Sequence, residues 1–401
     1  MTLSNILILL ATILASFPYT KLISIDVITQ PYAIIIVSLG LVGRFLNNKR
    51  VKLDSIGVQL VIFAVLGCVA YGFSFFINPD FGSIKWFVAY VSPAVFYIAF
   101  KEWIKYNKTV VFRAVVFSIA TWFAVGLIQK TISPTFLTGL VGERHSEASE
   151  NLAGTGRGVF GLAHEPTHHG FHVILMVTVA VLIEYNIYLL LIGIVSSLFF
   201  AMSSSVALCF IISLGISVFR WRLSDRLSLV FFLVVCFPLL YILLPEESRM
   251  REIMYKLLDS PMDLVLDDYS ANMRIGGLLG GIMSSLDNFL LPAGISHRLW
   301  LIDIDHYYSR FPWIVEISAE GWPSGYIIIV YQLGVFSLLL LSVVKKSYES
   351  SFLFKNSVRL FAFTSLNIFI FQFYLTAPYF GILLAAISVR FDEQSKTQLT
   401  E

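Results

Sequence analysis

The run LSLVFFLVVCFPLLYILL, Leu227–Leu244, has no charged side chain and no alternation of apolar with polar residues. The run ILILLATILASF, Ile6–Phe17, has the same character. A transmembrane β-strand alternates apolar and polar side chains, whereas a membrane-spanning helix is apolar along its length. Because lipid permits only helices or closed barrels to span it, these runs predict an all-α, polytopic integral membrane protein.

The composition of the whole chain supports this prediction. Of the 401 residues, 57% are hydrophobic and 13% are charged, and the mean hydropathy is +0.80. A soluble protein carries about 25% charged residues, so these charges are too few to cover a soluble surface of this size. We therefore expect the chain to lie in a lipid bilayer. The small net charge of +2, without a block of basic residues, gives no indication of a nucleic-acid partner.

Apolar runs recur along the chain and predict about twelve transmembrane helices, with about ten as the lower bound. The predicted spans are 5–18, 28–43, 56–77, 85–100, 110–129, 168–184, 187–202, 205–219, 227–244, 324–344, 358–373 and 375–389. Several are short for a bilayer core of ~30 Å. For the pairs 5–18 with 28–43 and 187–202 with 205–219, re-entrant segments are an alternative.

Lysine and arginine residues gather after the second, fourth, eighth and tenth predicted spans, which predicts the orientation of the chain. These basic residues are Arg44, Lys49, Arg50 and Lys52, then Lys101, Lys105, Lys108 and Arg113, then Arg220, Arg222 and Arg226, and finally Lys345, Lys346, Lys355 and Arg359. By the positive-inside rule, these loops and both termini are expected to be cytoplasmic. Two long polar segments, 130–167 and 245–323, then lie on the opposite side of a single transmembrane domain, 1–401. Short helices are expected in the second segment.

The first polar segment ends in GTGRGVFGLAHEPTHHGFH, Gly154–His172, just before a predicted span. Ionisable groups at the mouth of a span are costly to desolvate, which makes Arg157 and Glu165 candidates for function. The alternative is that such residues only cap the helix in interfacial water, and for His164 we prefer that interpretation.

Pro166 predicts that a helix begins within this stretch, because proline suits the first turn. His168 and His172 then share one helix face, with His169 one step round. The letters from His164 to His168 also match the H-E-x-x-H pattern of zinc proteases, which needs a continuous helix. Because Pro166 breaks the helix inside the pattern, we expect no metal site and no cofactor.

The second polar segment carries a further set of candidate residues. An amphipathic helix is predicted over 272–289, with Arg274 near its start. The other polar candidates of this segment are Tyr269, Ser270, His297, Arg298 and His306.

Several of these residues fall in patterns that resemble a known family. Arg157-Gly158-x-Phe160 followed by Glu165-Pro166 resembles the R-G-x-F…E-P signature of bacterial O-antigen and capsule repeat-unit polymerases, within the O-antigen ligase–polymerase superfamily. Ser270-x-x-x-Arg274 with Pro292-x-Gly294 is similar to the later S-x-x-x-R…P-x-G segment of that family, and Gly334-Val-Phe to its terminal pattern. Here Thr167 stands where the commoner form has serine.

The resemblance implies a GT-C-like fold with two large periplasmic segments in the bacterial inner membrane. It implies an enzyme that moves a glycan from undecaprenyl pyrophosphate to a lipid-linked acceptor on the periplasmic side. It also implies that a chain-length-regulating membrane protein is a partner. Arginine binds phosphate through two parallel hydrogen bonds, so Arg157, Arg274 and Arg298 become candidates for the pyrophosphate.

The acceptor hydroxyl needs a general base, for which Glu165, His169 and His168 are the candidates. The remaining polar residues are candidates for contacts with the acceptor or its sugars: His172, His297, His306, Ser270 and Tyr269.

Two other functions stay open. The related O-antigen ligase, which transfers finished chains to lipid A core, depends on a histidine in its long loop, and His297 or His306 keeps that function possible. A polysaccharide or lipid transporter is the alternative from another class. Transporters place polar groups and broken helices near the midplane of the bilayer, whereas the predicted spans here are almost uniformly apolar.

Overall fold

The computed structural model describes residues 2–21, 29–46, 53–77, 84–141, 158–218, 269–308, 325–371 and 377–400, with a few positions between 242 and 266. In these ranges the chain is helical, and the β-pairing found there is one isolated bridge between Thr20 and Val141. The chain is therefore an all-helical membrane protein in its described part, as the apolar runs predict.

The long and medium helices are α1 Leu3–Ser16, α2 Tyr32–Leu46, α3 Ser55–Ile77, α4 Ile84–Tyr106, α5 Lys108–Thr131, α7 Pro166–Ile183, α8 Ile187–Ile194, α9 Ser204–Val218, α13 Tyr269–Asp287, α14 His297–Tyr308, α15 Tyr326–Leu333, α16 Leu338–Ser351, α17 Asn356–Phe371 and α18 Pro378–Thr400. The short elements are the 3-10 helices η2 Thr138–Leu140 and η4 Gly334–Ser337, and the π-helical turn η3 Val195–Phe200.

Five described helices are long and apolar enough to cross a membrane: α3, α4, α5, α7 and the stretch Tyr326–Ser351. Every predicted span except 227–244 overlaps a described helix, and 227–244 lies outside the described residues apart from Ile242. α1 and α2 have 14 and 15 residues. At ~1.5 Å per residue each is shorter than a bilayer core of ~30 Å, so the count of twelve stays a prediction.

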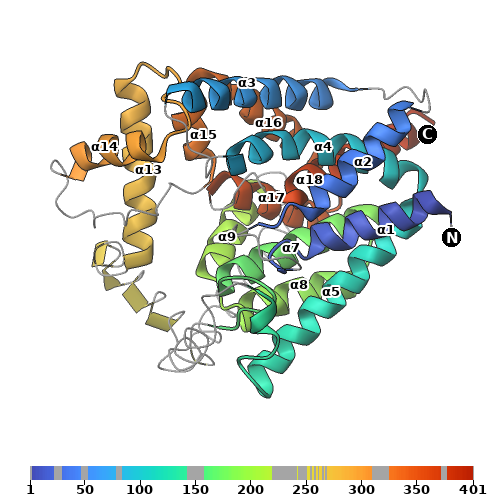
Figure 1. Ribbon diagram of the computed structural model, residues 1–401. Helices are drawn as coiled ribbons and strands as arrows, with labels where there is room; N and C mark the ends of the chain where they lie inside the picture. Colours follow the sequence, from blue (N-terminus) through green and yellow to red (C-terminus); the bar gives the residue numbers. More distant parts are fainter. Residues whose placement is uncertain are drawn as a thin grey trace.

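Helix α7 lies in the interior of the bundle, and α3 lies at its edge (Figure 1). All residues from His169 to Ile183 are buried, and α7 packs against α5, α8, α17 and α18. By contrast, α3 exposes a stripe of apolar side chains at helical spacing: Val58, Ile62, Val65, Val69, Phe73 and Phe76. Exposure of such a stripe to water would be unfavourable, so we interpret it as the lipid-facing side of α3.

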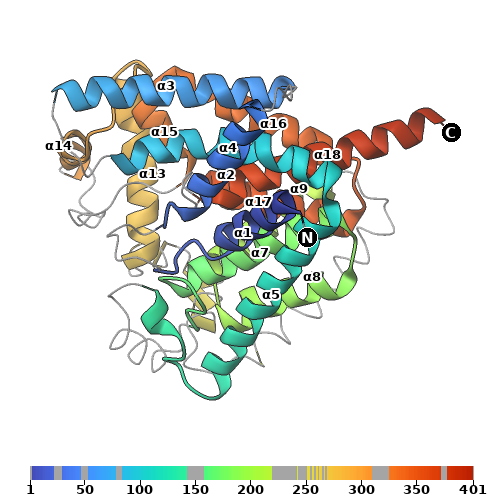
Figure 2. The same cartoon turned by 45° about the vertical axis from the view of Figure 1, so that its right-hand side comes forward.

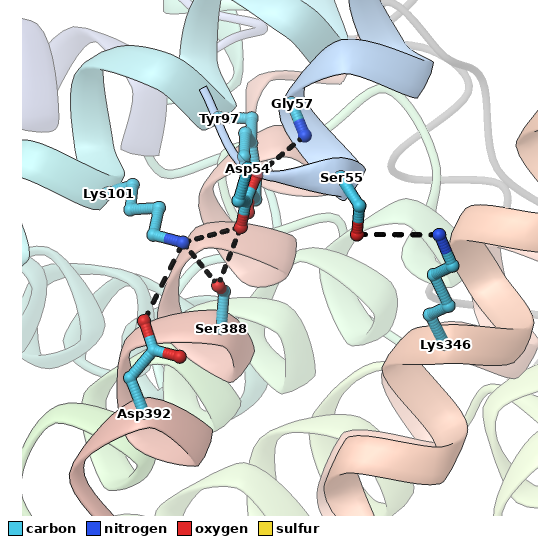
Figure 3. A network of polar contacts seen from close by, with 8 residues as sticks. All are labelled: Asp54, Ser55, Gly57, Tyr97, Lys101, Lys346, Ser388 and Asp392. Atoms are coloured by element: carbon cyan, nitrogen blue, oxygen red, sulfur yellow. Dashed lines mark hydrogen bonds and ion pairs between the residues drawn. The ribbon is translucent and has the colours of Figure 1, made fainter. Parts of the chain in front are cut away.

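Basic residues from separate helices meet at one end of the bundle. Lys101 of α4 contacts Asp54, just before α3, at 2.5 Å, and Asp392 of α18 at 3.7 Å. Figure 3 shows Lys101 between Asp54, Ser388 and Asp392, with the hydroxyl of Tyr97 also directed at Asp54. Arg44 of α2 pairs with Glu102 at 2.9 Å. We call this region the basic end.

The electrostatics of Asp54 explain why this network is stable. Burial on its own would raise the pKa of the Asp54 carboxyl. The hydrogen bonds from Lys101 and Tyr97, the backbone N–H of Gly57 and the charge of Lys101 outweigh burial and lower the pKa below its ordinary value. Asp54 is therefore held as a carboxylate that joins α3 to α4 and, through Ser388, to α18.

The described parts of both long polar segments lie at the other end of the bundle. Helix α13 runs crosswise to α3 there (Figures 1 and 2). The start of α13 is tied to α9 through Arg274 and Ser205, and Ile295, after α13, is tied to Ser74 near the end of α3. This geometry agrees with the alternation of basic and polar loops in the sequence.

Candidate functional site

The site is built around the start of α7. Glu165 occupies the N-cap in extended conformation, and Pro166 stands in the first turn, as predicted. Because the helix begins at Pro166, His164 lies outside it. The zinc-protease pattern therefore has no continuous helix here, and the described residues contain no group of three metal-binding side chains. Glu165 is exposed, so its carboxylate is accessible at the mouth of the bundle.

His168 and His172 share one face of α7, as their spacing predicts, and both contact Tyr19. The His168 ring is stacked on Tyr19 with centroids 5.9 Å apart, and the His172 ring meets Tyr19 edge-on at 5.9 Å. His172 Nε2 lies 2.9 Å from the carbonyl oxygen of Ser16. His172 is fully buried, whereas His168 is half-buried, so His168 is the one of the pair nearer the surface.

His169 is enclosed on all sides. It is fully buried, its ring meets Trp122 at 5.4 Å, and Gly126 of α5 leaves just enough room for it. A Cβ at Gly161 would lie 1.7 Å from His169 Nδ1, so the glycine lets the loop backbone pass directly over the ring. Neither ring nitrogen of His169 makes a hydrogen bond of normal geometry within the described part of the chain. This burial separates His169 from the exposed Glu165.

The loop 158–165, which leads into α7, is held by Gln129 of α5. Gly161 N–H donates to Gln129 Oε1 at 2.7 Å, and Gln129 Nε2 donates to the carbonyl oxygens of Gly161 at 2.9 Å and Phe136 at 2.8 Å. Gln129 is buried, so it satisfies backbone groups that water does not reach. Gln129 was not among the predicted residues; its one signal in the sequence is an uncharged polar residue near the end of an apolar span.

The other side of this loop rests on an irregular stretch between α8 and α9. Val159 N–H donates to the Phe200 carbonyl at 2.8 Å. Gly158 has φ +82, and a Cβ there would lie 2.5 Å from the Ala201 carbonyl oxygen. The π-turn η3 and the positive φ of Met202, +45, break the helix beneath it. Such π-turns are frequent at functional sites, and irregular backbone at membrane depth occurs where protein or water covers it.

Arg274 reaches the same stretch from α13. Its Nη1 donates to Ser205 Oγ at 2.7 Å, three positions after Met202. Arg274 is half-buried, and Ala201 in the same stretch lies against Gly158 of the loop that leads into α7. The structure therefore brings Arg274 to the stretch that supports the loop before Glu165, although the two residues are more than a hundred positions apart in sequence.

Three further predicted site residues, or their side chains, lie outside the part of the chain that the structure describes. Arg157 is outside the described residues, although the next residue, Gly158, packs on Ala201. Tyr269 and Ser270 open α13, and their side chains are outside the described part. That Arg157 and Arg274 bind one pyrophosphate therefore stays a prediction.

The remaining candidates are on α14, near the far end of α13. Asp303 of α14 accepts a hydrogen bond from Ser284 of α13. Ser284 is ten residues after Arg274, so α14 contacts α13 at a point ~15 Å along the helix axis from Arg274. His297 lies near Lys85 at the start of α4, and burial together with the Lys85 charge lowers the pKa of His297. Arg298 and His306 are exposed. The structure does not place Arg298, His297 or His306 beside Arg274.

Chemically, the start of α7 and the neighbouring start of α13 offer one half-buried guanidinium, one exposed carboxylate and one half-buried histidine. Such a set can bind a phosphate-bearing ligand and move a proton without any further group. Compared with known proteins, the chain matches no family model, no curated protein and no solved structure.

Proposed function

We propose that the chain is a membrane glycosyltransferase, a repeat-unit polymerase that moves a glycan from undecaprenyl pyrophosphate to a lipid-linked acceptor. The observation that carries this proposal is that Arg274 bonds Ser205 in the stretch 201–206, on which the loop before Glu165 also rests. Both charged residues belong to the segments that resemble the polymerase signatures. Arg274 and Glu165 lie at the end of the bundle opposite the basic end. The positive-inside rule assigns that opposite end to the periplasm.

In the proposed reaction, the acceptor hydroxyl oxygen attacks the anomeric carbon of the donor glycan. The bond between that carbon and the diphosphate oxygen breaks, and undecaprenyl pyrophosphate leaves with the bonding electrons. Arg274 stabilises the charge that develops on the diphosphate, with Arg157 as the second predicted contact. Glu165 accepts the hydroxyl proton, because it is the accessible member of the candidate bases.

The buried histidines take a different part in this proposal. His169 and His172 are fully enclosed by protein, so they position α7 and the loop 158–165 and do not touch substrate. His168, half-buried one turn after Glu165 on α7, orients Glu165 or relays its proton. Arg298, His297 and His306 lie further along the outer face, where an extended acceptor glycan could contact them.

The test is to replace Arg274 with Ala in cells that make the polysaccharide. Removing one group that stabilises transition-state charge typically slows an enzyme about 100- to 1,000-fold. We expect long chains to disappear from gels while single repeat units still reach lipid A core. Arg274→Lys should retain part of the activity, because it keeps the charge but loses the paired hydrogen bonds.

The matched control is Arg113→Ala, which removes an exposed arginine of α5 at the basic end. It should leave the distribution of chain lengths unchanged. A ligase gives another pattern: loss of the enzyme stops all transfer to lipid A core, single units included. An unchanged chain-length distribution in Arg274→Ala, with the protein present in normal amount, would contradict the proposal.

A further inference from the structure

The corner between α13 and α14 exposes large apolar side chains. Leu286 is 58% exposed, Phe289 88% and Leu291 62%. We call residues 286–291 the elbow. Leu278 and Ile282 continue its face along α13 at helical spacing, and both are exposed. A contiguous apolar patch of this kind marks a surface that contacts a partner or a membrane.

The elbow is a defined structure. Phe289 and Leu290 have φ values of 54 and 56, in the left-handed region that favours glycine. Leu290 N–H donates to the Ser285 carbonyl at 2.7 Å, and the Leu290 carbonyl accepts from Val335 N–H at 2.8 Å. Gly334 allows this contact, since a Cβ there would lie 2.1 Å from the Leu290 carbonyl oxygen. These bonds hold the Phe289 side chain outward.

The segment just after the elbow is tied to the last turns of α3, beside its lipid-facing side chains. Ile295 N–H, just after the elbow, donates to Ser74 Oγ at 2.8 Å. On either side of Ser74, Phe73 and Phe76 are 68% and 87% exposed. α3 has 23 residues, which at ~1.5 Å each is close to the ~30 Å of a bilayer core. The last turn of α3, and with it the elbow, therefore lies at the level of one membrane interface.

We propose that the elbow inserts into the leaflet at this end and anchors α13 and α14 to the bilayer. Its occupant is the hydrocarbon of bilayer phospholipid, because the neighbouring face of α3 already requires lipid. Asp287, which accepts a hydrogen bond from Tyr307, and the exposed Asn288 keep the insertion shallow. This places part of 245–323 in lipid, and it holds whatever reaction the protein catalyses.

Photo-crosslinking of the full-length protein in phosphatidylethanolamine and phosphatidylglycerol vesicles tests the anchor. Phe289→p-benzoylphenylalanine should give adducts with the mass of phospholipid after irradiation. The same substitution at Phe76 is the positive control, since α3 faces lipid. At His306, an exposed aromatic position of α14, it should give no lipid adduct.

Two results would overturn the proposal. One is an absence of lipid adducts at Phe289 while Phe76 gives them. The other is an adduct at Phe289 with a second protein chain, seen as a doubled mass on a gel, which would assign the elbow to a protein interface. Phe289→Ser with Leu291→Ser gives an independent measure. Because both side chains are mainly exposed, the variant should fold, but trypsin should cut at the exposed Arg298 in membranes faster than in the unmodified protein.

Discussion

A single buried polar residue can fix the shape of a whole loop in this bundle, and Gln129 is an example. Gln129 makes three hydrogen bonds to backbone groups, two of them with Gly161 in the loop that precedes α7. In a membrane protein these backbone groups have little access to water, so the side chain that satisfies them also fixes the shape of the loop.

Gln129→Leu should therefore reduce both the stability of the folded protein and its glycan transfer. The substitution leaves the Gly161 N–H and C=O buried without partners, at a cost of about 1–3 kcal/mol for each group. We expect a lower melting temperature in detergent and loss of long polysaccharide chains. Gln59→Leu is the control, since Gln59 bonds Ser342 at 3.1 Å and Lys346 at 3.0 Å, both toward the basic end. Equal effects of the two variants on transfer would refute a positioning role for Gln129.

Asp54 gives a pH-dependent prediction. Its folded-state pKa is lowered, so its stabilising contribution is complete above the ordinary value of 3.8 and is lost as pH falls through the folded-state pKa. Asp54→Asn should cost about 1–2 kcal/mol at pH 7, from weakened bonds to Lys101, Tyr97 and Gly57. The difference in melting temperature between the unmodified protein and Asp54→Asn should become smaller below about pH 4. A gap that stays constant from pH 7 to pH 3 would contradict this electrostatic account.

At the scale of elements, the loop 158–165 depends on glycines that touch a ring and a carbonyl. Gly161→Ala would place a Cβ 1.7 Å from His169 Nδ1 in a backbone with φ +59. We expect the loop to shift and transfer to be lost. Gly139→Ala is the matched control from the same polar segment, 130–167, since a Cβ at Gly139 meets nothing within 4 Å. Measured chain lengths should change for the first variant and not for the second.

Hydropathy predicted where helices occur far better than where they break. The apolar runs predicted the described helices to within a few residues, apart from three helices that end later than predicted. These are α4, which ends at Tyr106, α16, which ends at Ser351, and α18, which continues through Arg390 and Asp392 to Thr400. The break at Gly334 and the π-turn at Val195–Phe200 were missed, because broken and continuous helices bury the same apolar side chains. Figure 2 shows the end of α18 extending away from the bundle, where a helix no longer needs an apolar surface.

For the site, the sequence identified the charged residues and missed what holds them. Pro166 at the start of α7 and the shared face of His168 and His172 follow from helix geometry and are confirmed. Ser205, Tyr19 and Gln129 could not be predicted, because their roles arise from contacts between helices remote in sequence. The same holds for the burial of His169, which depends on Gly126 and Trp122 of α5.

The whole molecule has two chemically different ends. Lys101 and Arg44 lie at one, and Arg274 with Glu165 lies at the other. The positive-inside rule then predicts that α14 is periplasmic and that the end of α4 is cytoplasmic. In intact cells an impermeant maleimide should label His306→Cys, whereas Lys105→Cys should react only after the membrane is opened. The reverse pattern would invert the orientation and place the site on the wrong side for the proposed substrate.

Reconstitution of the purified protein in vesicles, with undecaprenyl-pyrophosphate-linked repeat units as the sole substrate, tests the proposed polymerase function directly. We predict a ladder of longer lipid-linked glycans and the release of undecaprenyl pyrophosphate. Both should be lost in Arg274→Ala and Glu165→Gln and retained in Arg113→Ala. If the unmodified protein is folded and makes no ladder, or if the ladder persists without Arg274 and Glu165, the protein is not the proposed polymerase.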